Sequence, residues 1–451
     1  MDEQRWRRER DDRSLRYAGR VLDPERWITL TADPDYLERY DGQVALLTAT
    51  NLLGRMTPSV ALSFPDTRLH PSIPWLSSTL HEAILRHMNS ADPFGSFCAR
   101  GPARDDIRLH FGREGKGIRV HGSGWNAYVG PASSPLPDTP DGNPIGAALA
   151  AVLVASQLFV RGLAPPARAT VVDALTWRSR IGDQPAAIPV TDLGRIFVVG
   201  IGSVGTAVLY FLLLANRPFS PTLIDMDRVK LHNLDRSPVF AHRDIGELKI
   251  HATRSFLHAG GVSDVETDST PLHESDRWMR RTSGTPDVLV SAANEMNVRY
   301  HVEMQYPPIQ IYGTTGLNWQ ASLIRHTPLV EACSCCLFPN EVPQPPLRCG
   351  SAPAESVPGN EQQVDVALPF LSFAAGLMAA AEILKLQIPG YPFSPNRVSL
   401  LSRPAPRFVA ARIPRREGCL CNDRSPDIHR GMLEGSRFAS LSRLRQSASY
   451  R

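Results

Sequence analysis

Apolar residues along this chain gather in short runs of strand length, separated by small or polar residues. The run Ile196–Val199 leads into a glycine-rich segment, the apolar stretch that follows has the length of a helix and ends at Leu214, and Thr222–Ile224 ends at Asp225. A strand, a glycine turn and an apolar helix are typical of the first unit of a nucleotide-binding sheet. We therefore predict an α/β fold built from Rossmann-like units.

Two longer apolar stretches approach the length of a membrane span. Pro144–Val160 contains Ser and Gln residues, Leu368–Leu386 contains Glu382 and Lys385, and both stretches are rich in alanine. Charged and polar residues inside such stretches are typical of helices buried in a large protein. We predict two buried helices.

The first half of the chain resembles the second half. Besides the two alanine-rich stretches, Ile118–Ala127 matches Ile309–Ala321, and Arg168–Asp173 matches Arg397–Leu401 in order and composition. This pattern predicts a tandem duplication. The predicted segments are a charged arm (1–34), a first domain (35–180), a second domain (190–423) with a crossover loop (340–365), and a disordered tail (424–451).

The first copy lacks a glycine-rich turn. Gln43–Met56 is expected at the position of the strand and turn, and Gly54 is its only glycine. Without small residues the backbone cannot close on a phosphate, so this copy is predicted to bind no nucleotide.

The second copy carries a phosphate-binding signature. Gly200, Gly202 and Gly205 form G-x-G-x-x-G directly after a strand, and Asp225 follows at the distance expected for a ribose ligand. Backbone N–H groups at such a turn, together with the helix dipole, bind phosphate. This signature alone fits a dinucleotide-dependent dehydrogenase equally well.

The residues after Asp225 distinguish these possibilities. The run Asp225–Arg236, with Asp227 and Asn233, and then Asp244–Lys249 resemble the adenylation site of the ThiF-type, ubiquitin-activating-enzyme-like family. The resemblance implies ATP as substrate, with Arg236 and Lys249 stabilising the departing pyrophosphate.

Two positions depart from the family pattern. Asn294 stands where the family has a magnesium-binding aspartate, and its neutral oxygen would neutralise less charge unless Glu295 or Asp227 contributes. The segment Glu38–Gln43 keeps three residues of the signature R-Y-x-R-Q but has Gly42 in place of its second arginine. The arginine that a partner half sends toward ATP would then be Arg39 or one from the N-terminal arm, unless Arg39 only makes a surface ion pair.

Four of the seven cysteines form two short-spaced pairs. Cys333 and Cys336, with Cys419 and Cys421, offer four thiolates from two distant turns, which suits a structural zinc site. Cys335 is an additional candidate ligand because the second pair is C-x-C. The alternative is a set of free thiols.

Cys349 lies in a proline-bounded segment, and the neighbouring Arg348 favours its thiolate. The family resemblance places a nucleophile here that takes the acyl group from the adenylate as a thioester. The alternative is an ordinary loop cysteine, and Cys98 is expected in the core.

A net charge of +4 over 451 residues gives little reason to expect nucleic acid or a membrane as partner. The mixed-charge N-terminus has no apolar core, so it is neither a signal peptide nor an anchor and is expected to be a solvated helix or loose arm. The paired cysteines favour a reducing cytoplasm.

The resemblance implies an enzyme that uses ATP, Mg²⁺ and structural Zn²⁺ to activate a ubiquitin-like protein and pass it to a conjugating enzyme, alone or as a homodimer. The degenerate first half in a single chain most resembles the activating enzymes of bacterial ubiquitin-like conjugation operons linked to antiphage defence. Two alternatives remain: activation of a sulfur-carrier protein, and a weakly active scaffold that binds a ubiquitin-like partner.

Overall fold

The computed structural model contains two mixed β-sheets. It describes residues 2–99, 107–137, 142–182, 188–189, 191–293, 296–337, 355–357, 360–364, 367–391, 395–419, 421 and 426–441. The first sheet has the order β3-β2-β1-β4-β5-β6-β7, and the second has the order β10-β9-β8-β11-β12-β13-β16-β17. In each sheet the first five strands are parallel and the later ones are antiparallel.

The strands of the first sheet are β1 (Ile28–Ala32), β2 (Ser59–Leu62), β3 (Ser96–Ala99), β4 (Ile107–Phe111), β5 (Ile118–Ser123), β6 (Asn126–Gly130) and β7 (Thr170–Asp173). Those of the second sheet are β8 (Arg195–Val199), β9 (Ser220–Ile224), β10 (Glu266–Asp268), β11 (Val288–Ser291), β12 (Gln310–Gly316), β13 (Gln320–His326), β16 (Arg397–Leu401) and β17 (Arg407–Ala411). The predicted matching segments occupy equivalent places, because β5–β6 and β12–β13 are antiparallel pairs followed in their sheets by β7 and β16.

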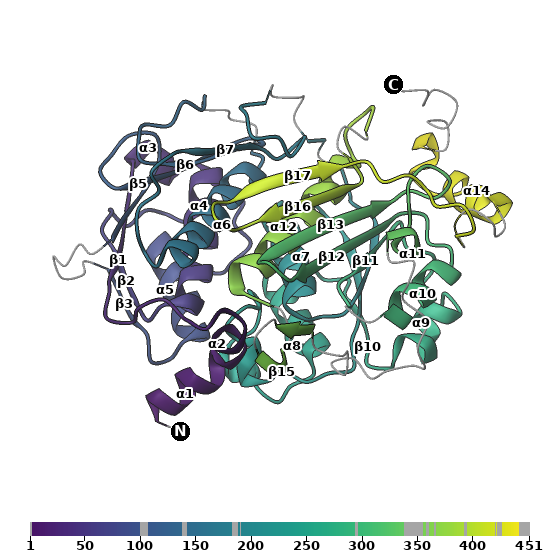
Figure 1. The fold of residues 1–451 in the computed structure, drawn as a ribbon, viewed down its shortest axis with the longest axis horizontal. Helices are drawn as coiled ribbons and strands as arrows, with labels where there is room; N and C mark the ends of the chain where they lie inside the picture. The colour runs from purple at the N-terminus through teal and green to yellow at the C-terminus, as the bar shows by residue number, and fades with distance from the viewer. Residues whose placement is uncertain are drawn as a thin grey trace.

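Four helices separate the two sheets (Figure 1). They are α4 (Tyr40–Met56) and α6 (Ile145–Arg161) from the first half, and α7 (Ser203–Leu214) and α12 (Pro369–Lys385) from the second. One continuous apolar core includes residues of all four helices. The two alanine-rich helices are buried as predicted, and no helix in the described part of the chain is long and apolar enough to cross a membrane.

The second sheet carries a further layer on its other face. A separate apolar cluster there includes Phe197 of β8, Trp278 of α9 (Asp276–Met279) and Val302 of α10 (Met296–Met304). The remaining helices and short helical turns are α3 (Pro34–Glu38), α5 (Leu80–Ala91), α8 (Lys249–Ala259), α11 (Ser334–Leu337), η1 (Leu231–Asn233), η2 (His242–Asp244) and η3 (Leu272–Glu274).

One prediction about the first half is wrong. Gln43–Met56 is not a strand and turn, because it lies within α4, while the first strand is Ile28–Ala32. Every residue of α4 is buried, so the helix has no solvent-exposed face, and polar residues such as Thr48, Asn51 and Arg55 are too few to make a clearly amphipathic pattern.

The N-terminal arm is packed rather than loose. It forms α1 (Glu3–Arg10) and α2 (Asp12–Ala18), and it buries Trp6, Arg10 and Tyr17. The Arg10 guanidinium pairs with Asp92 of the first half at 2.7 Å, and the Tyr17 hydroxyl donates to the Gly316 carbonyl of the second half at 3.3 Å. The arm therefore contacts both halves.

Regular structure also occurs in two segments predicted to lack it. The tail contains α14 (Pro426–Glu434), which buries His429 and Leu433 against the second half, so the prediction of a wholly disordered tail is wrong. The crossover segment contains β14 (Glu355–Val357) and β15 (Asn360–Val364), which pair antiparallel.

Candidate nucleotide-binding and adenylation site

The predicted glycine turn joins β8 to α7, as the sequence indicates. Gly200 has φ +87°, and a Cβ at Gly205 would lie 2.1 Å from the carbonyl oxygen of Gly200, so both positions require glycine. Gly202 is the N-cap residue of α7, and nothing lies within 4 Å of where its Cβ would be. The free amides at the start of α7 therefore face open space that suits a phosphate.

Asp225 directly follows β9 and fixes the glycine turn from the side. Its carboxylate accepts hydrogen bonds from the backbone N–H groups of Ile201 at 2.7 Å and Asp227 at 2.8 Å. Burial raises the pKa of Asp225, and the nearby charge of Lys249 opposes that shift. The carboxylate is thus held in place at the predicted ribose position.

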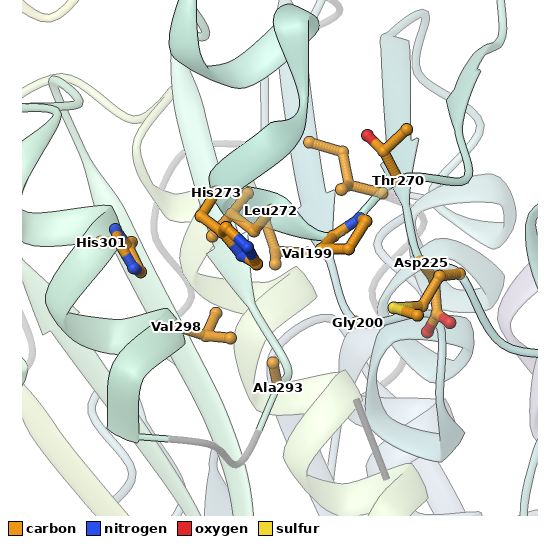
Figure 2. A pocket seen from close by; sticks show the side chains of 12 residues that line it. Val199, Gly200, Asp225, Thr270, Leu272, His273, Ala293, Val298 and His301 are labelled. Atoms are coloured by element: carbon orange, nitrogen blue, oxygen red, sulfur yellow. The ribbon is translucent and has the colours of Figure 1, made fainter. Parts of the chain in front are cut away.

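A narrow pocket opens beside Asp225 and Gly200 (Figure 2). It encloses about 40 Å³ and is mainly apolar. His273 and His301 stack with ring centroids 6.0 Å apart, and burial lowers the pKa of His301. The pocket is lined by Val199, Gly200, Ile224, Asp225, Met226, Thr270, Pro271, Leu272, His273, Ala293, Val298 and His301.

The two predicted cations lie next to this site, and both are paired. Lys249 begins α8, and its Nζ is 2.8 Å from Asp227 and 3.9 Å from Asp225. Arg236 is buried and donates to the His232 carbonyl at 2.7 Å and to the Asp235 carboxylate at 2.5 Å. Each cation is therefore held in position by an acidic neighbour.

The predicted residue Asn233 orders the same loop. Its side-chain oxygen accepts a hydrogen bond from the Lys230 N–H at 2.8 Å, which closes the turn η1. Its observed hydrogen bond is therefore with the protein backbone, on the loop that leads to Arg236.

Positive charge accumulates around His232. Burial lowers the pKa of His232 to about 3, and the next causes are the charges of Arg13, Arg236, Lys230 and Lys249. Three of these residues belong to the second half, whereas Arg13 comes from α2 in the N-terminal arm. Such a cluster of cations is suited to binding a polyphosphate.

Arg39 is not brought to this site. Its guanidinium pairs with Asp41 at 2.5 Å and packs over the Tyr36 ring, both in the first half. It lines a different cavity of about 420 Å³, which lies where β1 and β4 end. Asn294, Glu295 and Cys349 lie outside the described residues, so their predicted roles stay predictions.

The four paired cysteines come together. The sulfur of Cys333 lies 3.8 Å from that of Cys336 and 3.5 Å from that of Cys419, while Cys336 and Cys421 are 3.4 Å apart. Tetrahedral zinc with Zn–S bonds of about 2.3 Å places its sulfurs about 3.8 Å apart. All four are buried, and Cys335 is not part of the cluster, so these residues fit a closed zinc site.

Some site residues carry no recognisable signal in the sequence. Arg13 lies in a run of mixed charge, and His273 and His301 follow no motif. The packing of distant segments brings them to the site, so no local spacing could identify them.

The fold and this site define a nucleotide-binding α/β protein with two Rossmann-like sheets. A family comparison agrees: residues 191–421, which are 231 of the 451 residues, match the model of the ThiF family, so the chain belongs to this family. Residues 27–173 match the model of the BilD N-terminal domain. The BilD match is consistent with the predicted link to bacterial ubiquitin-like conjugation operons.

The individual relatives described next share only 16 to 26% sequence identity with this chain. The sulfur carrier protein adenylyltransferase of Thermus thermophilus is 26% identical over 198 residues, which are 42% of this chain and 68% of that protein. Crystal structures of E. coli MccB with MccA-N7isoASN and with ATP match 50% of this chain at 16 and 17% identity, with TM-scores of 0.40 and 0.38. This chain spans 66 and 65% of MccB in these two structures.

Proposed function

We propose that this protein uses ATP to adenylate the C-terminal carboxylate of a small ubiquitin-like protein. The observation that carries the proposal is the position of Lys249, whose Nζ lies 3.9 Å from Asp225, the carboxylate that binds the glycine turn at the Ile201 N–H. The charges of Arg13 and Arg236 add to that of Lys249 around His232. A dehydrogenase needs no such cations, whereas cleavage between the α and β phosphates develops negative charge that fixed cations stabilise.

The residues divide the reaction among them. Gly200, Gly202 and Gly205 present backbone amides to phosphate, and Asp225 takes the ribose. A carboxylate oxygen of the ubiquitin-like protein attacks the α-phosphorus, the bond to the β-phosphate oxygen breaks, and pyrophosphate leaves. Lys249 and Arg236 stabilise the charge on pyrophosphate.

Magnesium fits beside Asp227, whose carboxylate is partly exposed and adjacent to Lys249. Asp227 and Asn294 would hold the ion, which would neutralise phosphate charge when bound. Asp227 then supplies the carboxylate that Asn294 lacks.

The N-terminal arm supplies the arginine that Gly42 leaves missing. Arg13 lies near enough to His232 and the loop of Arg236 to affect that histidine, whereas Arg39 is occupied in the first half. A single chain would thereby complete its own site.

The next step in the proposal is transfer to Cys349. Its thiolate attacks the acyl-adenylate, the carbon–sulfur bond forms, and AMP leaves, after which a conjugating enzyme accepts the acyl group. The position of Cys349 in the sequence and the BilD-type first half support this step over simple sulfur-carrier activation. The adenylyltransferase relative favours the second candidate, activation of a sulfur-carrier protein without a thioester.

Exchange of radioactive pyrophosphate into ATP tests the adenylation. A small protein that ends in glycine and is encoded beside this gene should stimulate exchange in the wild type, and Lys249→Met should abolish it. If none of the candidate proteins stimulates pyrophosphate exchange, the adenylation proposal is overturned and a scaffold role is favoured. Cys349→Ala should keep exchange and lose a thiol-sensitive adduct; an adduct that persists would remove Cys349 from the mechanism.

A further inference from the structure

A buried arginine of the first half holds the loop that carries Arg236. Arg55 lies on α4 and is 4% exposed. Its Nη1 donates to the Leu234 carbonyl at 2.5 Å, and its Nη2 donates to the carbonyls of Pro238 and Phe240, each at 3.1 Å. One guanidinium thus binds main-chain oxygens on both sides of Arg236.

A second side chain from α4 supports the same contact. The Arg55 Nε donates to the Asn51 side-chain oxygen at 2.8 Å, and the Asn51 amide donates to the Pro238 carbonyl at 3.1 Å. The guanidinium is therefore fixed in orientation while it binds the loop.

The N-terminal arm holds the loop from another side. The Ser14 hydroxyl donates to one Asp235 oxygen at 3.0 Å, while Arg236 donates to the other. The segment 234–240 lies between the short turns η1 and η2 and contains no strand or helix of its own. Contacts from the first half and the arm therefore supply much of what fixes its shape.

The type of side chain at position 55 is informative. In the described part of the chain, every acceptor of its hydrogen bonds is a neutral oxygen. Burial lowers the pKa of Arg55 to about 9, opposed by Asp235 and Asp244, so it stays charged at neutral pH. Apolar packing would fill this space at less desolvation cost, so the site uses the forked geometry of the guanidinium, which makes four hydrogen bonds here.

We propose that Arg55 is a positioning residue for adenylation, through which the nucleotide-free half sets the place of Arg236 against the leaving pyrophosphate. This inference rests on the proposed function. It assigns the first half a task in the chemistry of the second half, because a loop shift of about 1 Å is enough to misplace a catalytic group.

The test compares Arg55→Met with Arg20→Met. Arg20 also joins the halves, because it donates to the Phe159 and Val160 carbonyls of the first half and packs over Trp319 of the second. Among the described residues, none of these contacts involves the loop 234–240. Arg55→Met should lower the kcat of ATP–pyrophosphate exchange at least tenfold with a smaller change in the KM for ATP. The kcat of Arg20→Met should stay within twofold of the wild-type value. The kcat of Arg55→Lys should lie between those of Arg55→Met and the wild type.

A double variant tests whether Arg55 acts through Arg236. Arg55→Met combined with Arg236→Met should be no slower than Arg236→Met alone, since both remove the same interaction. Multiplied losses, or an Arg55→Met enzyme within twofold of the wild-type kcat, would overturn the proposal. If Arg55→Met does not fold, Asn51→Ala removes one loop contact and takes its place in the comparison.

Hydrogen exchange separates this proposal from the proposed function. Amides of residues 231–240 should exchange faster in Arg55→Met than in the wild type or Arg20→Met, whatever reaction the protein catalyses. Unchanged protection would overturn the positioning role even in an active enzyme. Faster exchange of the loop in a protein without pyrophosphate exchange would keep the loop contact and refute the adenylation that it was proposed to serve.

Discussion

Individual glycines of the phosphate turn are constrained for different reasons, and substitutions should separate them. A Cβ at Gly205 meets the Gly200 carbonyl, whereas a Cβ at Gly202 meets nothing within 4 Å. Gly205→Ala should therefore lower both thermal stability and ATP affinity. Gly202→Ala should leave thermal stability unchanged and lower the affinity for ATP at least tenfold, or about 1.4 kcal/mol. The reason is that the added methyl group occupies the space of the phosphate. Calorimetric titration with ATP and thermal unfolding measure the two effects.

Gly431→Ala in α14 is the matched control, since a Cβ there also meets nothing within 4 Å. It should change neither quantity appreciably. Wild-type ATP affinity in Gly202→Ala would show that phosphate does not bind at the start of α7.

Sequence identifies residues whose function depends on local spacing. Gly200, Gly205 and Asp225 belong to one strand–turn–helix–strand unit, and the structure places them together. Arg13 of the arm affects His232, and Arg55 of α4 binds the loop of Arg236, so only tertiary packing reveals them. Arg39 shows the converse, because a local motif suggested a role that its pairing with Asp41 does not support.

At the scale of structural elements, the two turns that carry the cysteines are predicted to bind one zinc ion together, and this can be tested. One turn is α11 with Cys333 and Cys336, and the other follows β17 with Cys419 and Cys421. We expect elemental mass spectrometry of the purified protein to find one zinc ion per chain. Cys421→Ser should lose the zinc and lower the unfolding midpoint by on the order of 5–10 °C. The cysteine site is closed and is not part of the nucleotide site, so the affinity for ATP should change less than the unfolding midpoint does.

Cys335→Ser is the control for the zinc experiment, because this neighbouring thiol lies outside the cluster. It should keep the metal and the midpoint. Loss of zinc from Cys335→Ser, or a wild-type protein without bound metal after growth with zinc, would contradict the assignment.

The predictability of an element follows from its surroundings. The helices α6 and α12 could be predicted from their length and alanine content, whereas the wholly buried α4 has neither an exposed face nor an alanine-rich sequence. In the arm, the run of mixed charge predicted a solvated helix or a loose arm, and exposed i,i+4 ion pairs such as Arg16 with Asp12 do form there. The buried residues Trp6, Arg10, Ser14 and Tyr17 recur at helical spacing, but their partners lie in distant segments.

At the scale of the whole molecule, the buried carboxylate of Glu382 contacts residues of both halves. Glu382 of α12 accepts from Lys385 at 2.7 Å, from Arg325 of β13 at 2.6 Å and from the Trp177 ring N–H of the first half at 3.1 Å. Lys385 also lies 4.4 Å from the Trp177 ring centroid. Burial disfavours ionisation of Glu382, but Lys385 and Arg325 outweigh it and lower its pKa to about 2.

This shift sets the pH range of the contribution from Glu382. Because the folded pKa lies below the unfolded value near 4.5, the stabilisation is fully present above that pH and is lost as pH falls toward 2. Glu382→Gln leaves the Lys385 charge buried without this carboxylate, so we expect a loss of about 3–5 kcal/mol at pH 7. Denaturant unfolding should show the gap between wild type and variant narrowing between pH 4.5 and pH 2.

Glu82→Gln provides the comparison, because Glu82 forms an exposed pair with Arg86 at 2.6 Å. Its cost should stay below about 1 kcal/mol at every pH. A gap for Glu382→Gln that is as large at pH 2.5 as at pH 7 would show that lost packing, and not the carboxylate charge, joins the halves at this point. A narrowing gap instead means that the interface between the halves depends on ionised Glu382, and acid should then loosen the contact with Trp177 before the sheets unfold.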